Sequence, residues 1–227
     1  MSSDQAEKTA AAYELALQNK GALCEVTTIE NEFLFVGTIG ACDEKTKELR
    51  IDLRRKNVRL RGEDSETDVK ISLLHAKARG DVILLYGTAY QRADTFWYIR
   101  LKDGGRYSES RGNFRLSVRS SCAVRTASGT AETDCRIVDI SITGIGFLSQ
   151  KEYMVGENLT FSGLRLLENS ADHVLRAEIV RRQGVSLRDG TSCFRYGCRF
   201  LDITEKEVDM LCHDIFALQS VGLRGGR

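Results

Sequence analysis

Two short segments in the second half of the chain carry the residues best suited to bind a ligand. The first contains Arg111 and Arg115, and the second contains Asp139, Ser141 and Gly144 in the spacing Asp-x-Ser-x-x-Gly. A guanidinium group binds phosphate, or the O6/N7 edge of guanine, through its fixed fork of N–H donors. A carboxylate accepts hydrogen bonds from guanine N1 and N2, a hydroxyl can reach a phosphate, and a glycine lets a ring approach the backbone. Together these residues predict a site for a guanine nucleotide.

The order of the two segments is more informative than either segment alone. The spacing Arg-x-x-x-Arg occurs five times in the chain, whereas Asp-x-Ser-x-x-Gly occurs once and follows Arg115 by 24 residues. This combination resembles the PilZ family, whose members bind the second messenger cyclic di-GMP. The resemblance extends from about Tyr107 to the end of the chain. It includes the segment Tyr196-Gly197-Cys198-Arg199-Phe200-Leu201, which precedes a predicted helix.

The resemblance implies a role for each residue of the two segments. The implied cyclic di-GMP-binding residues are Arg111, Arg115, Asp139, Ser141 and Gly144. The arginines would bind phosphate or a guanine edge, the aspartate guanine N1 and N2, and the serine and glycine would complete the site. Family members with a further arginine just before the first motif arginine often hold two stacked ligand molecules. This chain has Ser110 at that position, so the number of ligand molecules in the site, one or two, remains open.

Composition places the chain among soluble globular proteins. Of its 227 residues 42% are hydrophobic and 29% are charged, and the formal net charge is +1. Such a balance gives no general attraction to nucleic acid or to an anionic membrane. No apolar run is long enough for a membrane span, and the N-terminus has no signal-peptide pattern. The seven cysteines are scattered without metal-ligand spacing, which favours a reducing, cytoplasmic setting without a metal or cofactor.

Short segments rich in β-branched and aromatic residues run through both halves of the chain. In the first half they are 22–29, 32–40, 48–53, 69–77, 81–90 and 95–101. In the second half they are 115–126, 135–140, 144–149, 158–167, 173–183 and 193–202. Regular short strands separated by turn residues are typical of antiparallel barrels or sandwiches.

Helical spacing is found at both ends of the chain. Residues 4–20 have apolar side chains at helical spacing, and this helix either packs across a barrel mouth or binds a partner. Thr204 and Glu207 form a capping box ahead of an apolar stripe that ends at Gly222. We therefore predict a mainly β fold of two tandem small antiparallel β-barrels, with an N-terminal helix and a C-terminal helix.

The glycines and serines of residues 102–110 predict a flexible boundary between two domains. The predicted parts are an N-terminal helix at 1–20, an N-terminal β-barrel domain at 21–101, a flexible linker at 102–110, and a PilZ β-barrel domain with a C-terminal helix at 111–227.

Four functions come into consideration for this sequence. The first is a cytosolic cyclic di-GMP receptor that changes its interdomain orientation and acts on a protein partner; its two-domain layout resembles flagellar-brake proteins, so the partner could be the flagellar motor. The alternative is a PilZ-like interaction module that binds no ligand. An enzyme is disfavoured because the three histidines, including His75, show no catalytic or metal-ligand spacing. Nucleic-acid binding depends on the basic segment 50–61 alone, which also fits a solvated hairpin, so we expect no nucleic acid as partner.

Overall fold

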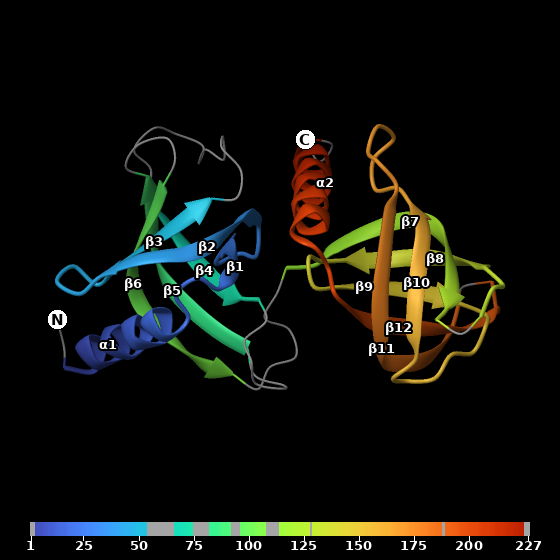
Figure 1. The fold of residues 1–227 in the computed structure, drawn as a ribbon, viewed down its shortest axis with the longest axis horizontal. Coiled ribbons are helices and arrows are strands. Elements are labelled where there is room, and N and C mark those ends of the chain that lie inside the picture. Colours follow the sequence, from blue (N-terminus) through green and yellow to red (C-terminus); the bar gives the residue numbers. More distant parts are fainter. Residues whose placement is uncertain are drawn as a thin grey trace. The chain divides into compact units, whose positions relative to one another are not determined.

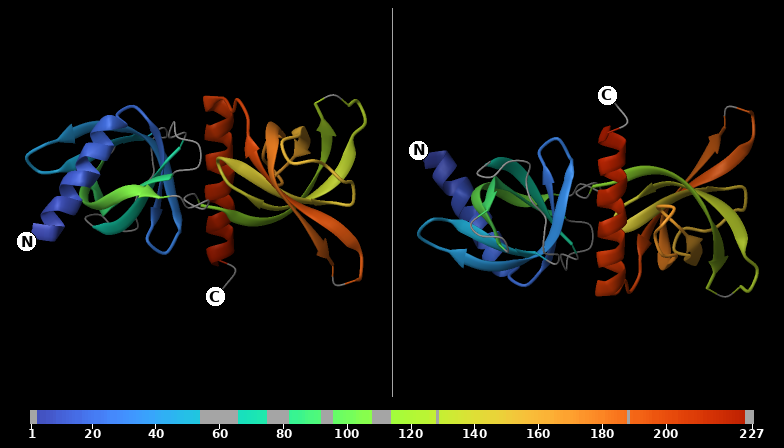
Figure 2. Two further views of the ribbon diagram at one scale, coloured as in Figure 1. Left: turned by 90° about the horizontal axis from the view of Figure 1, so that it is seen from below. Right: turned by 90° about the horizontal axis from the view of Figure 1, so that it is seen from above.

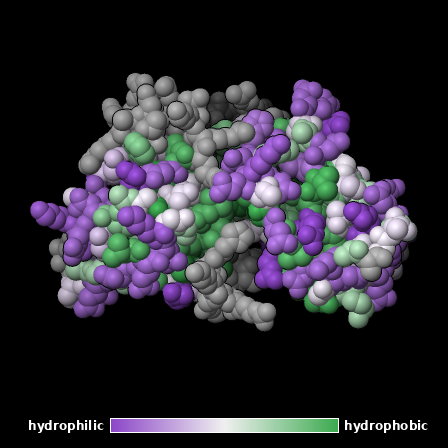
Figure 3. All heavy atoms as spheres, in the orientation of Figure 1, coloured by the Kyte–Doolittle hydropathy of each residue, from purple (hydrophilic) through white to green (hydrophobic). Residues whose placement is uncertain are grey.

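A computed structural model describes residues 3–53, 66–74, 82–91, 96–107, 114–127, 129–187 and 189–224. The predicted fold class is confirmed: the chain is mainly β, and its described strands form two closed antiparallel barrels, with one helix near each end of the chain. The chain divides into two compact units, Met1–Phe114 and Arg115–Arg227. Hydrophilic residues cover much of the drawn surface of each unit (Figure 3).

The first unit is a barrel with one helix packed on it (Figure 1). Its elements are α1 Ser3–Gln18, β1 Leu23–Thr28, β2 Phe33–Asp43, β3 Glu48–Leu53, β4 Thr67–Leu73, β5 Val82–Gln91 and β6 Phe96–Tyr107. The strand order is β1-β2-β3-β6-β5-β4, and pairing of β1 with β4 closes the barrel. Alternate apolar side chains such as Val26, Ile51 and Trp97 fill the interior and have no exposed surface.

Helix α1 lies against β6, and this packing corrects the predicted linker. The first six residues of 102–110 are the end of β6, and residues 108–110 lie outside the described part of the chain. Gly104 is needed there because a Cβ at this position would come within 3.0 Å of the Cβ of Ala12 on α1. The carbonyl oxygen of Lys102 accepts hydrogen bonds from Gln5 and Thr9 of the same helix. The glycine thus allows a close helix–strand contact.

The second unit is a barrel with α2 at one end (Figure 2). Its elements are β7 Leu116–Thr126, β8 Thr133–Ile140, β9 Gly144–Ser149, β10 Asn158–Leu164, β11 His173–Ser186, β12 Ser192–Phe200 and α2 Glu205–Arg224. The strand order is β10-β11-β12-β9-β8-β7, and pairing of β10 with β7 closes the barrel. Phe147 stacks on Tyr196 and meets Phe161 edge-on in the interior.

The predicted start of α2 is confirmed, whereas the helix continues past the predicted stop at Gly222 to Arg224. The backbone N–H of Glu207 donates to Thr204 Oγ1 at 3.3 Å, and the N–H of Thr204 donates to Glu207 Oε2 at 2.7 Å, which is the predicted capping box. The apolar stripe of the helix is buried through Val208, Leu211 and Ile215.

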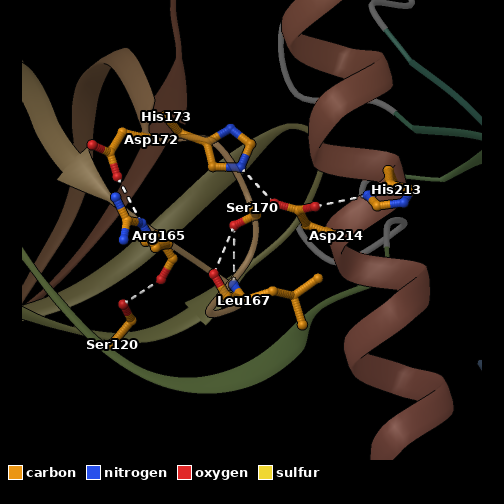
Figure 4. A network of polar contacts seen from close by, with 8 residues as sticks. All are labelled: Ser120, Arg165, Leu167, Ser170, Asp172, His173, His213 and Asp214. Atoms are coloured by element: carbon orange, nitrogen blue, oxygen red, sulfur yellow. Dashed lines mark hydrogen bonds and ion pairs between the residues drawn. The ribbon is translucent and has the colours of Figure 1, made fainter.

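A buried polar contact also joins α2 to the barrel (Figure 4). His173, the first residue of β11, places Nε2 at 2.9 Å from Oδ2 of Asp214 on α2, and the side chains of both are at most 5% exposed. The other oxygen of Asp214 lies 2.9 Å from Nδ1 of His213, which is 55% exposed. Arg165 pairs with Asp172 at 3.0 Å and fixes the loop that leads into His173.

Several sequence-based expectations fall outside the described residues. They concern His75, Arg111, and most of the basic segment 50–61, of which residues 54–61 are not described. Within that segment Arg50 pairs with Asp52 at 2.7 Å. No helix in the described part of the chain is long and apolar enough to cross a membrane.

Glu25 is a carboxylic acid buried in the first unit. It lies on β1, is 1% exposed, and its Oε1 accepts the backbone N–H of Phe114 at 2.6 Å. The ring of Phe114 packs against Phe33 with 5.8 Å between centroids. Burial raises the pKa of Glu25 to about 7, against the opposing effects of the Phe114 N–H and Lys70. The last residue of the first unit is therefore held by a carboxyl group that titrates near neutral pH.

We predict that Glu25 makes the first unit less stable as the pH rises. Its pKa is higher in the folded state than the ordinary 4.5, so the folded state binds the proton more tightly. The stabilisation is complete below pH 4.5 and is lost as the pH rises toward 7. Between pH 5 and pH 7.5 the wild type should lose about 2 kcal/mol relative to Glu25→Gln, at about 1.4 kcal/mol per pKa unit.

Urea unfolding followed by tryptophan fluorescence measures this difference, because Trp97 is the single tryptophan and lies in the first barrel. Glu30→Gln, an exposed substitution in the same unit, is the control and should keep the wild-type pH dependence. Parallel stability–pH curves for Glu25→Gln and the wild type would contradict the prediction.

Candidate functional site

Asp139 lies near the end of β8, between two arginines. Its Oδ1 is 3.1 Å from Nη1 of Arg115, and its Oδ2 is 2.9 Å from Nη2 of Arg195. The side chain of Asp139 is 14% exposed, whereas those of Arg115 and Arg195 are 44% and 45% exposed. The structure thus brings together one arginine of the first predicted segment and the aspartate of the second. Each carboxylate oxygen has its own guanidinium partner.

Arg195 is absent from the site that the sequence predicts. Its position follows from the strand order β8-β9-β12. Asp139 pairs with Gly146 on β9, and Gly146 pairs with Gly197 on β12. Arg195 is two residues from Gly197 and therefore lies on the same face of the sheet. A sequence signal for this contact would have required the strand order, which no local motif contains.

Gly146 provides the space that Asp139 occupies. A Cβ at this position would lie 2.6 Å from both carboxylate oxygens of Asp139. Real Cβ atoms do not come this close to another heavy atom, so any side chain here would displace the carboxylate. The opposite glycine, Gly197, has only the Cβ of Arg181 within 4 Å, at 3.8 Å. The carboxylate of Asp139 thus covers Gly146, and bare backbone remains at the neighbouring Gly197.

Ser141 and Gly144 form the turn that joins β8 to β9. The N–H of Ser141 donates to the carbonyl oxygen of Gly144 at 2.9 Å, and Ser141 Oγ accepts the N–H of Thr143 at 3.3 Å. Ser141 is 1% exposed, so in this structure its hydroxyl serves the turn. A Cβ at Gly144 would lie 2.2 Å from the carbonyl oxygen of Cys198, so this glycine is needed for contact with β12.

The site offers hydrogen-bond donors in excess of acceptors. Two guanidinium groups face one carboxylate, so the cluster carries a net positive charge and suits an anionic ligand. The described residues contain no group of three or more His, Cys, Asp or Glu side chains placed to hold a metal ion. The geometry favours the binding of a ligand that presents both anionic groups and hydrogen-bond donors.

Comparison with known proteins bears directly on this half of the chain. The model of the PilZ domain family matches residues 109–217, which span all six strands of the second barrel and most of α2. The second unit is a PilZ domain. No curated protein matches the sequence of the chain.

Several solved structures match nearly the whole chain at low sequence identity. MrkH from K. pneumonia in complex with c-di-GMP is 12% identical, with 97% of this chain and 96% of that chain covered and a TM-score of 0.42. YcgR from Escherichia coli in complex with c-di-GMP is 14% identical, with coverage of 96% and 93% and a TM-score of 0.42. The Bacillus subtilis inhibitor of motility MotI is 14% identical, with coverage of 92% and 99% and a TM-score of 0.41.

We predict that the two glycines of the PilZ domain respond differently to alanine. Gly144→Ala forces a Cβ against backbone at 2.2 Å and should destabilise the domain by about 3 kcal/mol. Gly146→Ala meets only the end of the Asp139 side chain, which can rotate away, and should cost less than about 1 kcal/mol. Differential scanning calorimetry measures both changes.

The displacement of Asp139 in Gly146→Ala can be followed separately. The NMR signals of the Arg115 and Arg195 side-chain N–H groups should move toward those of exposed arginine, while the rest of the domain keeps its spectrum. An unchanged pair of arginine signals in Gly146→Ala would show that this glycine does not make room for the carboxylate.

Proposed function

We propose that the protein is a receptor for cyclic di-GMP, and that its PilZ domain binds this ligand without transforming it. The observation that carries the proposal is the meeting of Arg115 and Asp139 in a PilZ domain, at 3.1 Å, from segments 24 residues apart. We assign ligand contacts to Arg111, Arg115 and Asp139. Ser141 and Gly144 belong to the site because their turn holds the end of β8 in place.

The chemistry of the cluster matches the groups of the ligand. Guanine N1–H and N2–H₂ donate to a carboxylate such as Asp139, and phosphate oxygens accept from guanidinium groups. In the structure Arg115 and Arg195 both bind the carboxylate of Asp139. The ligand would replace these ion pairs: its guanine N1–H and N2–H₂ would donate to the carboxylate, and its acceptor groups would bind the released guanidinium groups.

The free energies of the contacts favour replacement of the two ion pairs by contacts with the ligand. Ion pairs as exposed as these contribute about 0–1 kcal/mol each, because water and salt screen them. Hydrogen bonds to a charged group contribute about 1.5–3 kcal/mol each. A ligand that supplies several such bonds at once therefore gains more free energy than opening the resting ion pairs costs.

Isothermal titration calorimetry with cyclic di-GMP tests the proposal. We predict that the wild type binds and that Arg115→Ala lowers the affinity about tenfold to a hundredfold, since about 1.4 kcal/mol is a factor of ten. Arg119→Ala is the matched control, because Arg119 is an exposed arginine on β7, the strand that begins directly after Arg115. The affinity of this variant should stay within about twofold of the wild type. Folded wild-type protein that shows no binding at high ligand concentration would identify the chain as a non-binding interaction module.

We further propose that ligand binding restrains the connection between the two units. The division between them falls immediately before Arg115, so an assigned ligand contact is the first residue of the second unit. Fixing this residue in a complex removes freedom from the adjoining backbone, at about 1–2 kcal/mol per residue ordered. The restrained form would then act on a protein partner in the control of motility or surface behaviour, with the flagellar motor as the candidate.

Small-angle X-ray scattering tests the restraint. We predict that saturating cyclic di-GMP changes the distance distribution of the wild type and leaves that of Arg115→Ala unchanged. A wild-type profile that stays constant while calorimetry shows saturation would refute the restraint and leave the receptor assignment intact.

A further inference from the structure

We infer that Arg195 is a further ligand-binding residue, which leaves Asp139 when the ligand arrives and binds the O6/N7 edge of the same guanine. This inference rests on the proposed function, because it assigns a contact within the proposed site. Arg195 belongs to neither of the two segments that define the site in the sequence. Its assignment comes from its place in the second barrel.

The first observation is that Arg195 already holds the group that the guanine would take. Its Nη2 is 2.9 Å from Asp139 Oδ2, and its side chain is 45% exposed. A base that pairs with Asp139 must displace this guanidinium, which then lies at the edge of the incoming base. An arginine displaced in this way remains within reach of the ligand, since its backbone is fixed in β12.

The second observation is the bare backbone at Gly197, next to Gly146, over which the carboxylate of Asp139 lies. The two glycines pair with each other across β9 and β12, beside both Asp139 and Arg195. Neither has a side chain on the outer face, and the space over Gly197 is open apart from the Cβ of Arg181 at 3.8 Å. A flat purine can approach the backbone at Gly197 because this residue has no side chain there. Asp139 and Arg195 then flank the base at its edge.

A carboxylate beside a guanidinium supplies the acceptors and donors that complement the polar groups of guanine. Its N1–H and N2–H₂ are donors, and the neighbouring O6 and N7 are acceptors. Asp139 supplies acceptors for the first two, and Arg195 supplies donors for the other two. Adenine carries an amino donor where guanine has O6, so it would face the guanidinium with the wrong group. The inferred contact therefore contributes to selection of guanine.

Arg199 provides a matched comparison on the same strand. It lies four residues from Arg195 on the same outer face, and its side chain is 62% exposed. Its Nη2 pairs with Oε2 of Glu178 at 2.7 Å, so it is engaged on the β11 side. Replacing Arg199 removes one positive charge from the same face without removing a group that touches Asp139.

Calorimetric titrations with cyclic di-GMP and with its 7-deazaguanine analogue test the inference. The analogue has a carbon where guanine has N7, so it lacks one acceptor for Arg195. The wild type should bind the analogue about tenfold more weakly than cyclic di-GMP. Arg195→Ala should bind cyclic di-GMP about tenfold to a hundredfold more weakly than the wild type, and should no longer distinguish the two ligands. Arg199→Ala should behave as the wild type in both titrations.

The outcomes separate this inference from the proposed function. A wild type that binds neither ligand refutes the receptor assignment itself. Wild-type affinity in Arg195→Ala refutes the role of Arg195 and leaves the receptor assignment standing. If Arg195→Ala binds more weakly but still distinguishes the two ligands, Arg195 only positions Asp139 and the direct contact is refuted. Arg195→Lys keeps the positive charge but loses the planar fork of N–H donors. We expect this variant also to lose the preference for cyclic di-GMP over the 7-deazaguanine analogue.

Discussion

The site depends on one carboxylate shared by two guanidinium groups. Asp139 is bound through one oxygen to Arg115 and through the other to Arg195, so segments distant in the sequence meet at a single side chain. The contact is possible because Gly146 has no Cβ where the carboxylate lies. The hydrogen-bonding groups of the cluster pair with one another, and the two guanidinium groups are about half exposed to water. That arrangement suits a site that must open to a ligand without a large cost.

Local patterns were sufficient to predict most of the fold. The short β-rich segments correspond to the observed strands within a few residues, and Thr204 and Glu207 marked the start of α2. Both signals are local, since strand alternation and helix capping depend on residues close in sequence. The segment 102–107 was predicted as a flexible linker but is strand, because Gly104 accommodates Ala12 of a helix some ninety residues earlier. A glycine that permits packing looks the same in a sequence as a glycine that permits flexibility.

The candidate site was predictable only in part, because some of its contacts join residues that are distant in the sequence. The meeting of Arg115 with Asp139 followed from a resemblance to PilZ domains, which supplies spatial knowledge that spacing alone lacks. Arg195 was missed because its contact depends on β12 lying next to β9, and β9 next to β8. Ser141, which the motif assigns to the site, is buried and accepts a hydrogen bond from its own turn, since a serine after a strand bonds its local backbone readily.

The contact between His173 and Asp214 determines more than whether α2 stays attached to the second barrel. An apolar stripe alone would let the helix shift along its axis, because a shift of one turn places similar apolar side chains against the same surface of the barrel. The buried histidine–aspartate pair forms at one position of the helix only, and a shift of one turn would leave His173 Nε2 and Asp214 Oδ2 without each other, at about 1–3 kcal/mol for each buried group. The pair therefore sets the axial register of the helix, and the outward face of α2 is presented to other molecules in one defined orientation.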